Sequence, residues 1–152
     1  MELDGRLISL HKHWCVADSV NYNLRRSLSA PADKTHGMAH EFAAMGASHS
    51  AFLTLSVYYS LLYVVVEGYR EIGLEDKGID TVLTNGEYVE SLRRFRNATF
   101  HFQKEPISAK MMEFLEQKDS EHWIRDLNRA LREFFEKSLD LKSVVTRFQE
   151  MK

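Results

Sequence analysis

The chain has 152 residues, of which 44% are hydrophobic and 28% are charged, and its formal net charge is −2. This length fits one domain with a sizeable core, and the composition excludes a disordered chain. The slight negative charge excludes a wide basic surface for nucleic acid, so any RNA contact must depend on a local patch. We therefore expect a single domain over residues 1–152.

Two long helices are predicted in the first half of the chain. Apolar residues recur at helical spacing over residues 7–28, and Pro31 prevents the helix from continuing. Residues 50–72 are apolar almost all round, which predicts a central helix contacted on most sides, with Gly73 as its stop. Residues 29–46 between them predict a connection, with room for a short helix, that is a candidate functional loop.

The second half predicts shorter helices. One is expected near residues 79–83, and a capping box of Thr84 and Glu87 starts another over residues 87–102. Ser108 caps a further helix, and Asp119 or Ser120 caps the next, which residues 141–152 extend or follow with another short helix. No stretch shows a sustained alternation typical of strands. The predicted fold is all-α, an up-and-down bundle of four or five helices.

The sequence also predicts the compartment. The most apolar stretch, residues 51–66, is shorter than the ~20 residues of a membrane span, so we expect a core helix and no membrane contact. The N-terminus lacks the basic start and apolar run of a signal peptide. The single cysteine, Cys15, cannot form an internal disulfide, and we interpret it as a small buried residue on a helix. These features favour the cytoplasm.

Residues 91–104 form a local basic patch without any acidic residue. Its cations are Arg93, Arg94, Arg96 and Lys104, and its aromatic residues are Phe95, Phe100 and Phe102. Positive charge interleaved with aromatic rings suits single-stranded RNA. We expect Arg93, Arg94 and Lys104 to contact the RNA backbone, although the two arginines could equally be a solvated helix face and the aromatic residues ordinary packing.

Within this patch the chain resembles the HEPN superfamily, which includes RNA-cleaving toxins and phage-defence effectors. The family signature is arginine, a polar residue, three further residues and histidine, and this chain has Arg96, Asn97 and then His101. The match covers this short motif and the helical layout, not the whole chain. The same spacing from Arg6 to His11 lacks the polar residue and lies at the N-terminus, so we treat it as chance.

The resemblance implies a metal-independent endoribonuclease without a cofactor. His101 is the expected general base or acid, because histidine titrates near neutral pH. Arg96 is the expected phosphate clamp, because a guanidinium stays charged and binds phosphate oxygens bidentately. Asn97 is expected to orient His101 or the phosphate. Glu67 either orients an arginine or is simply a partly exposed residue at the end of its helix.

Spacing on a helix limits how these residues meet. Positions five apart differ by ~140° in direction, so Arg96 and His101 cannot converge within one straight helix, whereas Asn97 and His101 share a face. Either the helix bends or ends near Thr99, or a second copy completes the site. HEPN proteins generally dimerise with two motifs across the interface, so the resemblance implies a twofold homodimer with Arg96, Asn97 and His101 of each chain facing one cleft.

One position departs from the family. Many HEPN toxins carry a tyrosine two residues after the histidine, where an antitoxin transfers a nucleotide, and here that position is Gln103. Neutralisation by that modification is therefore not expected. The sequence leaves open whether an antitoxin protein is a partner, and it does not specify the RNA target.

Two other classes of function remain open. A metal enzyme would use His36 and His40 with Glu41, or the pairs Asp33–His36 and Asp119–His122. A non-catalytic helical dimer of HEPN type would bind a protein or nucleotide partner, and His101 would then be an ordinary helix-terminal residue. Retention of both Arg96 and His101 favours the nuclease over this module.

Overall fold

A computed structural model of the chain describes residues 5–29 and 38–140, and all regular structure within them is helical. The helices are α1 (Gly5–Leu28), α2 (Met38–Ile72), α3 (Lys77–Leu83), α4 (Gly86–Phe100), α5 (Ala109–Glu116) and α6 (Ser120–Ser138). The predicted all-α class is confirmed. The described residues hold six helices, and the predicted bundle had four or five. The count is higher because the short helices α3 and α5 are separate elements beside the four longer ones.

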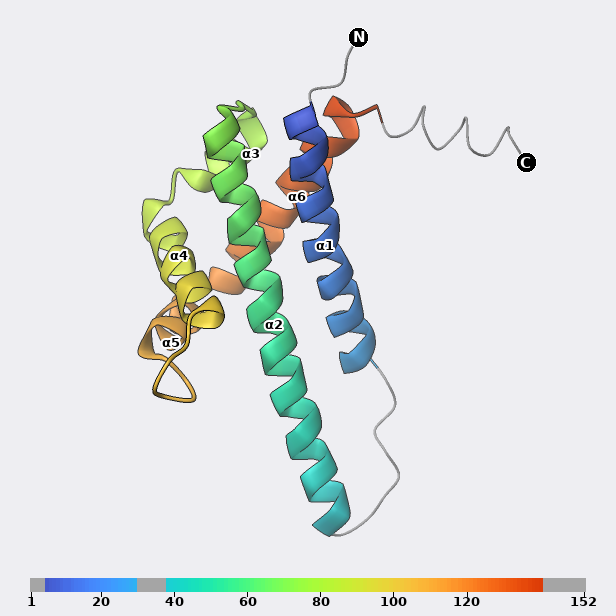
Figure 1. The fold of residues 1–152 in the computed structure, drawn as a ribbon, viewed down its shortest axis with the longest axis vertical. Coiled ribbons are helices and arrows are strands. Elements are labelled where there is room, and N and C mark those ends of the chain that lie inside the picture. The colour runs from blue at the N-terminus through green and yellow to red at the C-terminus, as the bar shows by residue number, and fades with distance from the viewer. Residues whose placement is uncertain (1–4, 30–37, 141–152) are drawn as a thin grey trace, which may run out of the picture.

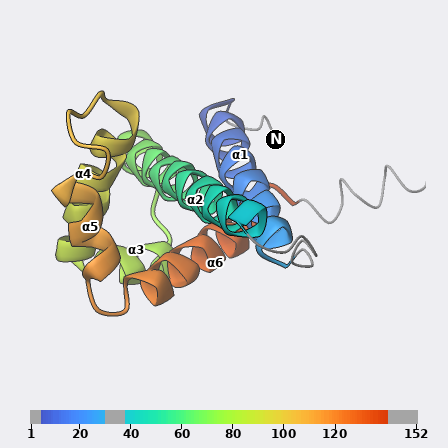
Figure 2. The same ribbon diagram turned by 90° about the horizontal axis from the view of Figure 1, so that it is seen from below.

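The long helices surround α2 (Figures 1 and 2). α1 and α2 run antiparallel as a hairpin, α4 and α5 lie on the other side of α2, and α6 crosses obliquely behind it. The core is continuous across these contacts. Its largest fully buried side chains include Leu62 and Val65 of α2, Leu92 and Phe95 of α4, and Leu127 and Leu131 of α6.

Helix α2 begins earlier than the sequence predicted. It starts at Met38 instead of near residue 50, so residues 38–46, expected in a connection, are helical. Several good helix formers in this segment, with Gly46 as a tolerable exception, explain the extension. Residues 30–37 of the predicted loop lie outside the described residues.

Burial of α2 is uneven along its length. Its C-terminal half is surrounded by the other helices, as predicted, and Leu62 and Val65 are fully buried. Nearer the N-terminus, Leu53 is 50% exposed, so that part is not contacted on most sides. The sequence pattern alone could not separate Leu53 from the covered part, because residues 50–72 are apolar almost all round.

The predicted helix boundaries differ in how well they hold. Gly73 ends α2 with a φ of 74°, and Leu74 N donates to Tyr69 O at 3.2 Å in a Schellman motif. Ser108 caps α5 as predicted, accepting from Lys110 N. The capping box was wrong: Asn85 caps α4 by accepting from Tyr88 N, while Thr84 donates to Thr81 O.

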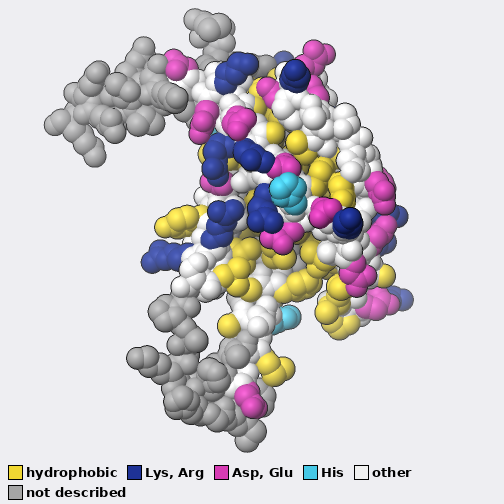
Figure 3. Space-filling view, turned by 180° about the vertical axis from the view of Figure 1, so that it is seen from behind, with side chains coloured by type: hydrophobic (Ala, Val, Ile, Leu, Met, Phe, Trp, Pro, Cys, Tyr) yellow, Lys and Arg dark blue, Asp and Glu magenta, His cyan; other side chains and the backbone are white. Residues whose placement is uncertain are grey.

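Helix α6 is fastened to the rest by two indole groups. Trp14 Nε1 of α1 donates to Asn128 Oδ1 at 2.9 Å, and Trp123 Nε1 donates to Val82 O at 3.0 Å. Asp119 occupies the N-cap position in a left-handed conformation without a side-chain bond to the helix. Satisfying both buried indole donors fixes α6 against α1 and α3. On the face of α1 and α6 that Figure 3 shows, cationic and acidic side chains lie side by side.

Part of α2 passes the length and hydropathy test for a membrane span. The segment Met45–Ile72 has 28 residues, and its most apolar window has a mean hydropathy of 1.5. Of that window, 44% is buried inside the fold, and one such helix is weak evidence for a membrane span, because core helices pass the same test. The prediction that the apolar stretch is too short for a membrane span was therefore wrong in length, because the helix continues on both sides of residues 51–66.

The contact between α1 and α2 depends on a missing side chain. A Cβ at Gly68 would lie 2.7 Å from Leu10 Cδ1, whereas nothing lies within 4 Å of one at Gly46. Gly68→Val should therefore lower the free energy of unfolding by about 1–3 kcal/mol through overpacking. Gly46→Val is the matched control in the same helix and should change it by less than about 0.5 kcal/mol. Urea denaturation measures both, and equal effects would contradict the close approach.

Candidate functional site

The motif lies where α4 ends. The helix stops at Phe100, two residues before the predicted boundary, and His101 takes extended backbone angles of −105° and 141°. The His101 N–H still donates to Asn97 O at 3.0 Å. The helix therefore ends just before His101. The spacing of Arg96 and His101 had left this open, together with a bend near Thr99 and a second copy of the chain. The side chain of His101 is exposed.

Arg96 is held between α4 and α2. Its Nη2 donates to Glu67 Oε1 at 2.7 Å and to Oε2 at 2.9 Å, and its guanidinium carbon lies 5.2 Å from the centre of the Tyr63 ring. The side chain is 21% exposed, and its Nε is buried without a hydrogen-bond partner. Arg96 is therefore oriented from outside its own helix, and Glu67 is both partly exposed and the residue that orients it.

The electrostatics of this contact favour a fixed arginine. Burial, followed by the nearby Glu67 carboxylate, raises the pKa of the Tyr63 hydroxyl, whereas Arg93 and Arg96 act in the opposite direction. Tyr63 is thus neutral near pH 7 and presents the face of its ring to the guanidinium. A cation over an aromatic face gains about 0.5–2 kcal/mol, depending on its exposure.

His101 faces a different part of the molecule from Arg96. It lines a groove of about 440 Å³ that is bounded by Phe52, Leu53 and Val57 of α2 and by the loop after α4. Arg96 contacts α2 one or more turns further along, at Tyr63 and Glu67. No hydrogen bond or ion pair joins Arg96 to His101 among the described residues. Within one chain, the two side chains therefore have different surroundings, and no contact joins them among the described residues.

Asn97 lies between the two groups and is half-buried. Its main-chain carbonyl accepts the His101 N–H, while its side-chain amide makes no hydrogen bond within the described part of the chain. His101 is the C-cap of α4, one turn after Asn97, and no hydrogen bond joins their two side chains among the described residues. Asn97 therefore fixes the position of the His101 backbone and keeps its amide available.

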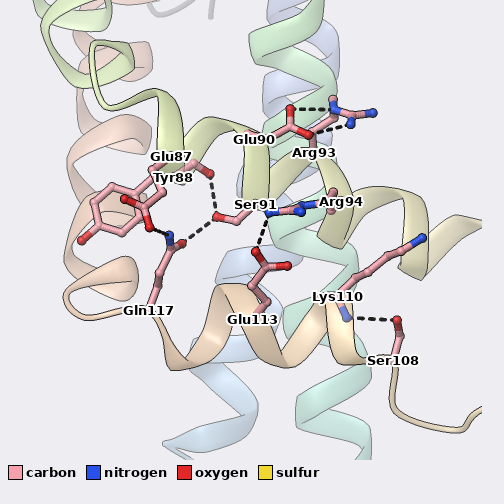
Figure 4. Close-up of polar contacts among 10 residues, drawn as sticks. All are labelled: Glu87, Tyr88, Glu90, Ser91, Arg93, Arg94, Ser108, Lys110, Glu113 and Gln117. Carbon is pink, nitrogen blue, oxygen red and sulfur yellow. Dashed lines mark hydrogen bonds and ion pairs between the residues drawn. The ribbon is translucent and has the colours of Figure 1, made fainter.

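The arginines of the basic patch are paired with carboxylates from beyond residues 91–104 (Figure 4). Arg93 forms hydrogen bonds with Glu90 at 2.9 and 2.6 Å, and Arg94 pairs with Glu113 of α5. The hydrogen bond to Arg93 lowers the pKa of the Glu90 carboxyl, and the same bond raises that of Arg93. Lys104 is exposed in the loop after α4. The acid-free patch of the sequence is therefore largely charge-balanced once folded.

An aromatic trio holds α4 in place beneath the motif. The rings of Tyr59, Phe95 and Phe114 lie with centroids 5.8–5.9 Å apart and join α2, α4 and α5. Phe95 and Phe114 are fully buried, whereas Phe100 is 50% exposed and Phe102 is 93% exposed. Of the aromatic residues in the patch, only Phe95 is core, and the two beside His101 are open to a ligand or partner.

Sequence reasoning named some partners of the site and missed others. Glu67 was recognisable as the first acid after a long apolar run, at the position where α2 reaches α4. Glu113 and Tyr63 carried no such signal, because a helical acid or an apolar-face tyrosine is common in any bundle. Their roles depend on which turn of α2 or α5 lies beside α4.

The metal alternative has limited support. The side chains of His36 and His40 lie outside the described residues, so that cluster remains untested. His122 Nε2 lies 3.4 Å from Asp126 Oδ2 on its own helix, in place of the predicted partner Asp119. Within residues 5–29 and 38–140, no group of three metal-ligating side chains occurs where side chains are described.

Cys15 is half-buried on α1, as a small helical residue. Its Sγ lies 3.4 Å from His11 Nε2, and burial followed by the charge of Asp18 raises the pKa of the thiol. A thiol with a raised pKa is a poor nucleophile at neutral pH. Cys15 is therefore not a competing candidate for the site.

No family model, curated protein or solved structure matches this chain.

The bond between Glu67 and Arg96 should be worth more than its exposed counterpart on the same helix. A double-mutant cycle of Glu67→Gln and Arg96→Gln should give a coupling of about 1 kcal/mol, because Arg96 is only 21% exposed. The control cycle of Glu90→Gln and Arg93→Gln should give about 0.3–0.5 kcal/mol, because both side chains are exposed. Urea unfolding measures both cycles, and a smaller coupling for Glu67–Arg96 would contradict its role in orienting the arginine.

Proposed function

We propose that the protein is a metal-independent endoribonuclease of the HEPN type, and that it acts as a cytoplasmic toxin or defence effector. One observation carries the proposal: α4 ends between Arg96 and His101. It leaves an exposed histidine without a side-chain partner among the described residues, five positions after a guanidinium that Glu67 holds in place. A general acid or base beside an oriented cation is the minimum for cleaving RNA through its 2′-hydroxyl.

Each residue has a separate chemical task. His101 removes the proton of the 2′-hydroxyl or delivers one to the leaving 5′-oxygen. Arg96 stabilises the extra negative charge on the phosphate, using the donors that Glu67 does not occupy. Asn97 offers its free amide to a phosphate oxygen. Arg93, Arg94 and Lys104 attract the strand, with Arg93 and Arg94 exchanging their carboxylate partners for phosphates at little cost, since exposed ion pairs are weak.

A second copy of the chain is part of the proposal. Within one copy Arg96 and His101 face different stretches of α2, so the acid–base group of one copy must serve the clamp of the other. The exposed side chains near His101 support an interface there, since Leu53, Phe100, Phe102 and Ile107 are each at least half exposed. Exposed apolar side chains gathered at one end of a fold are typical of a surface that another protein covers.

The alternative is a non-catalytic helical dimer that binds a protein or nucleotide partner. The pairing of Arg96 with Glu67 favours it, because a carboxylate within 2.9 Å already neutralises the proposed clamp. Under this alternative Arg96 is a structural link between α4 and α2, and His101 contributes no chemistry.

RNA cleavage in the presence of EDTA separates the two. We expect the wild-type protein to cleave single-stranded RNA, and His101→Ala and Arg96→Ala each to lose about 100-fold or more, the usual contribution of a general acid–base group or charge clamp. Matched controls are His49→Ala and Arg26→Ala, which remove exposed residues elsewhere and should keep full activity. Circular dichroism and sedimentation should show that all four variants stay folded with the same oligomeric state.

The result that overturns the nuclease is equally definite. If the wild-type protein cleaves none of a set of structured and unstructured RNAs, or if His101→Ala cleaves as fast as His49→Ala, the helical dimer without catalysis replaces it.

A mixing experiment tests whether the site is shared between copies. Arg96→Ala and His101→Ala are each inactive alone, but a mixed dimer retains one intact arginine and one intact histidine. We expect co-refolded mixtures to regain a measurable part of the wild-type cleavage rate. Labelled chains verify that subunits have exchanged. If exchanged mixtures then recover no cleavage, both residues of each site lie on one chain, which contradicts the shared site.

A further inference from the structure

The chemistry of RNA cleavage needs one more group than the motif supplies. When the 2′-oxygen attacks phosphorus, the P–O2′ bond forms and the P–O5′ bond breaks, which leaves a cyclic phosphate and a 5′-hydroxyl end. A base must take the 2′-hydroxyl proton, and an acid must supply one to the 5′-oxygen. If the His101 of one copy serves the Arg96 of the other, each clamp receives a single histidine. The second proton transfer therefore needs a group from elsewhere.

A groove between α1 and α2 adjoins the carboxylate that holds Arg96. These helices form the antiparallel hairpin of Figure 1, and the groove measures about 340 Å³, within the usual range of ligand pockets. Glu67 lines the groove, and the same Glu67 accepts from Arg96 Nη2 at 2.7 and 2.9 Å. The guanidinium of Arg96 therefore lies within hydrogen-bonding distance of the edge of this groove, which we call the α1–α2 groove.

His13 of α1 lines the α1–α2 groove together with Glu67 and is exposed. Its Nδ1 lies 2.8 Å from the main-chain carbonyl oxygen of Ser9. Because a carbonyl oxygen only accepts, Nδ1 carries the proton, and the neutral ring keeps its lone pair on Nε2. The helix thus orients the ring of His13 and sets the tautomer that accepts a proton at the outer nitrogen.

The other described histidines outside the motif lack this combination. His11 lies ~200° round the helix from His13, and its ring packs 5.1 Å from that of Phe135. Burial lowers the pKa of His11. His122 lies 3.4 Å from a carboxylate of its own helix, and His49 lies on α2 several turns before the groove. The spacing of Arg6 and His11 is therefore not a second motif.

The charged groups around the groove balance one another. Arg6 of α1 lines it with Glu67 and Glu71 of α2, and Arg96 lies at its edge. Two cations and two carboxylates leave no net charge, so the groove does not gather phosphate by itself. Its chemistry suits the neutral hydroxyl groups of a ribose, while Arg96 binds the adjoining phosphate.

We propose that His13 is the general base of the ribonuclease, an inference that rests on the proposed function. Nε2 of His13 removes the 2′-hydroxyl proton, and His101 of the second copy protonates the leaving 5′-oxygen. The ribose lies in the α1–α2 groove, and its phosphate meets the Arg96 donors that Glu67 leaves open. His13 then releases its proton to water and His101 regains one, so each turnover restores the enzyme.

A substitution of His13 tests whether it takes part. His13→Asn should lower cleavage of single-stranded RNA in EDTA by about 100-fold or more, the usual contribution of a general base. His49→Asn replaces another exposed histidine and should keep the wild-type rate. His13→Asn should also flatten the acidic limb of the pH–rate profile, because no base remains to lose its proton as the pH rises. Circular dichroism and sedimentation should show both variants folded with the same oligomeric state.

A substrate with a good leaving group separates the base from the acid. In a ribonucleoside 3′-(nitrophenyl) phosphate, the phenolate departs without needing a proton. His101→Ala should cleave this ester within about tenfold of the wild-type rate, because the acid is no longer required. His13→Asn should remain about 100-fold slower than the wild type, because the 2′-hydroxyl must still lose its proton.

Mixed dimers test which copy supplies each group. A dimer of His13→Asn with His101→Ala retains one site in which His13 and Arg96 of one copy meet the His101 of the other. That mixture should regain part of the wild-type rate. A dimer of His13→Asn with Arg96→Ala retains no such site and should stay inactive.

Several results would overturn the role of His13 while leaving the ribonuclease intact. His13→Asn cleaving RNA as fast as His49→Asn would exclude it from the chemistry. Recovery of His13→Asn on the nitrophenyl ester would make His13 an acid. Recovery of the mixture with Arg96→Ala would place His13 and Arg96 in different sites. A wild-type protein that cleaves neither RNA nor the ester overturns the ribonuclease and the role of His13 together.

Discussion

Burial of the C-terminal half of α2 is the constraint on which the rest of the structure depends. Leu62, Val65 and Val66 are at most 1% exposed because α1, α4 and α6 cover the helix from different sides. Each covering helix must leave its own polar face outward, so the functional candidates lie where these helices meet α2. The same helix therefore has two faces with different chemistry, one toward α4 and the other toward α1 and α6.

On the α4 side, α2 contributes the groups that hold the motif. Tyr63 and Glu67 are one turn apart and meet the same guanidinium, so the orientation of Arg96 depends on the packing of two helices. Below them the aromatic trio of Tyr59, Phe95 and Phe114 fixes the rotation of α4. On the other side, Tyr58 and Tyr59 line a cleft between α1, α2 and α6. Tyrosines of the core helix thus pack their rings inside the fold and also line or contact the surface sites.

Charge pairing decides how the motif can act. Arg93, Arg94 and Arg96 each meet a carboxylate, so the arginines of the motif helix are attractive to phosphate only through exchange. Exposed pairs exchange readily, whereas the less exposed Arg96 keeps its orientation while it retains unoccupied donors. In the ribonuclease that we propose, the exposed arginines would attract the RNA strand and Arg96 would hold one phosphate.

The sequence by itself determined the all-α class, the positions of the long helices, the stop at Gly73 and the cap at Ser108, because periodicity and terminal residues act locally. It also marked Arg96, Asn97 and His101 and showed that one straight helix could not join the first to the last. The carboxylate partners of the arginines and the cleft between α1, α2 and α6 were decided only by the tertiary structure. Each depends on residues far apart in the chain, such as Glu67 with Arg96 and Arg25 with Arg125, whose proximity follows from how helices pack around α2 rather than from any local pattern.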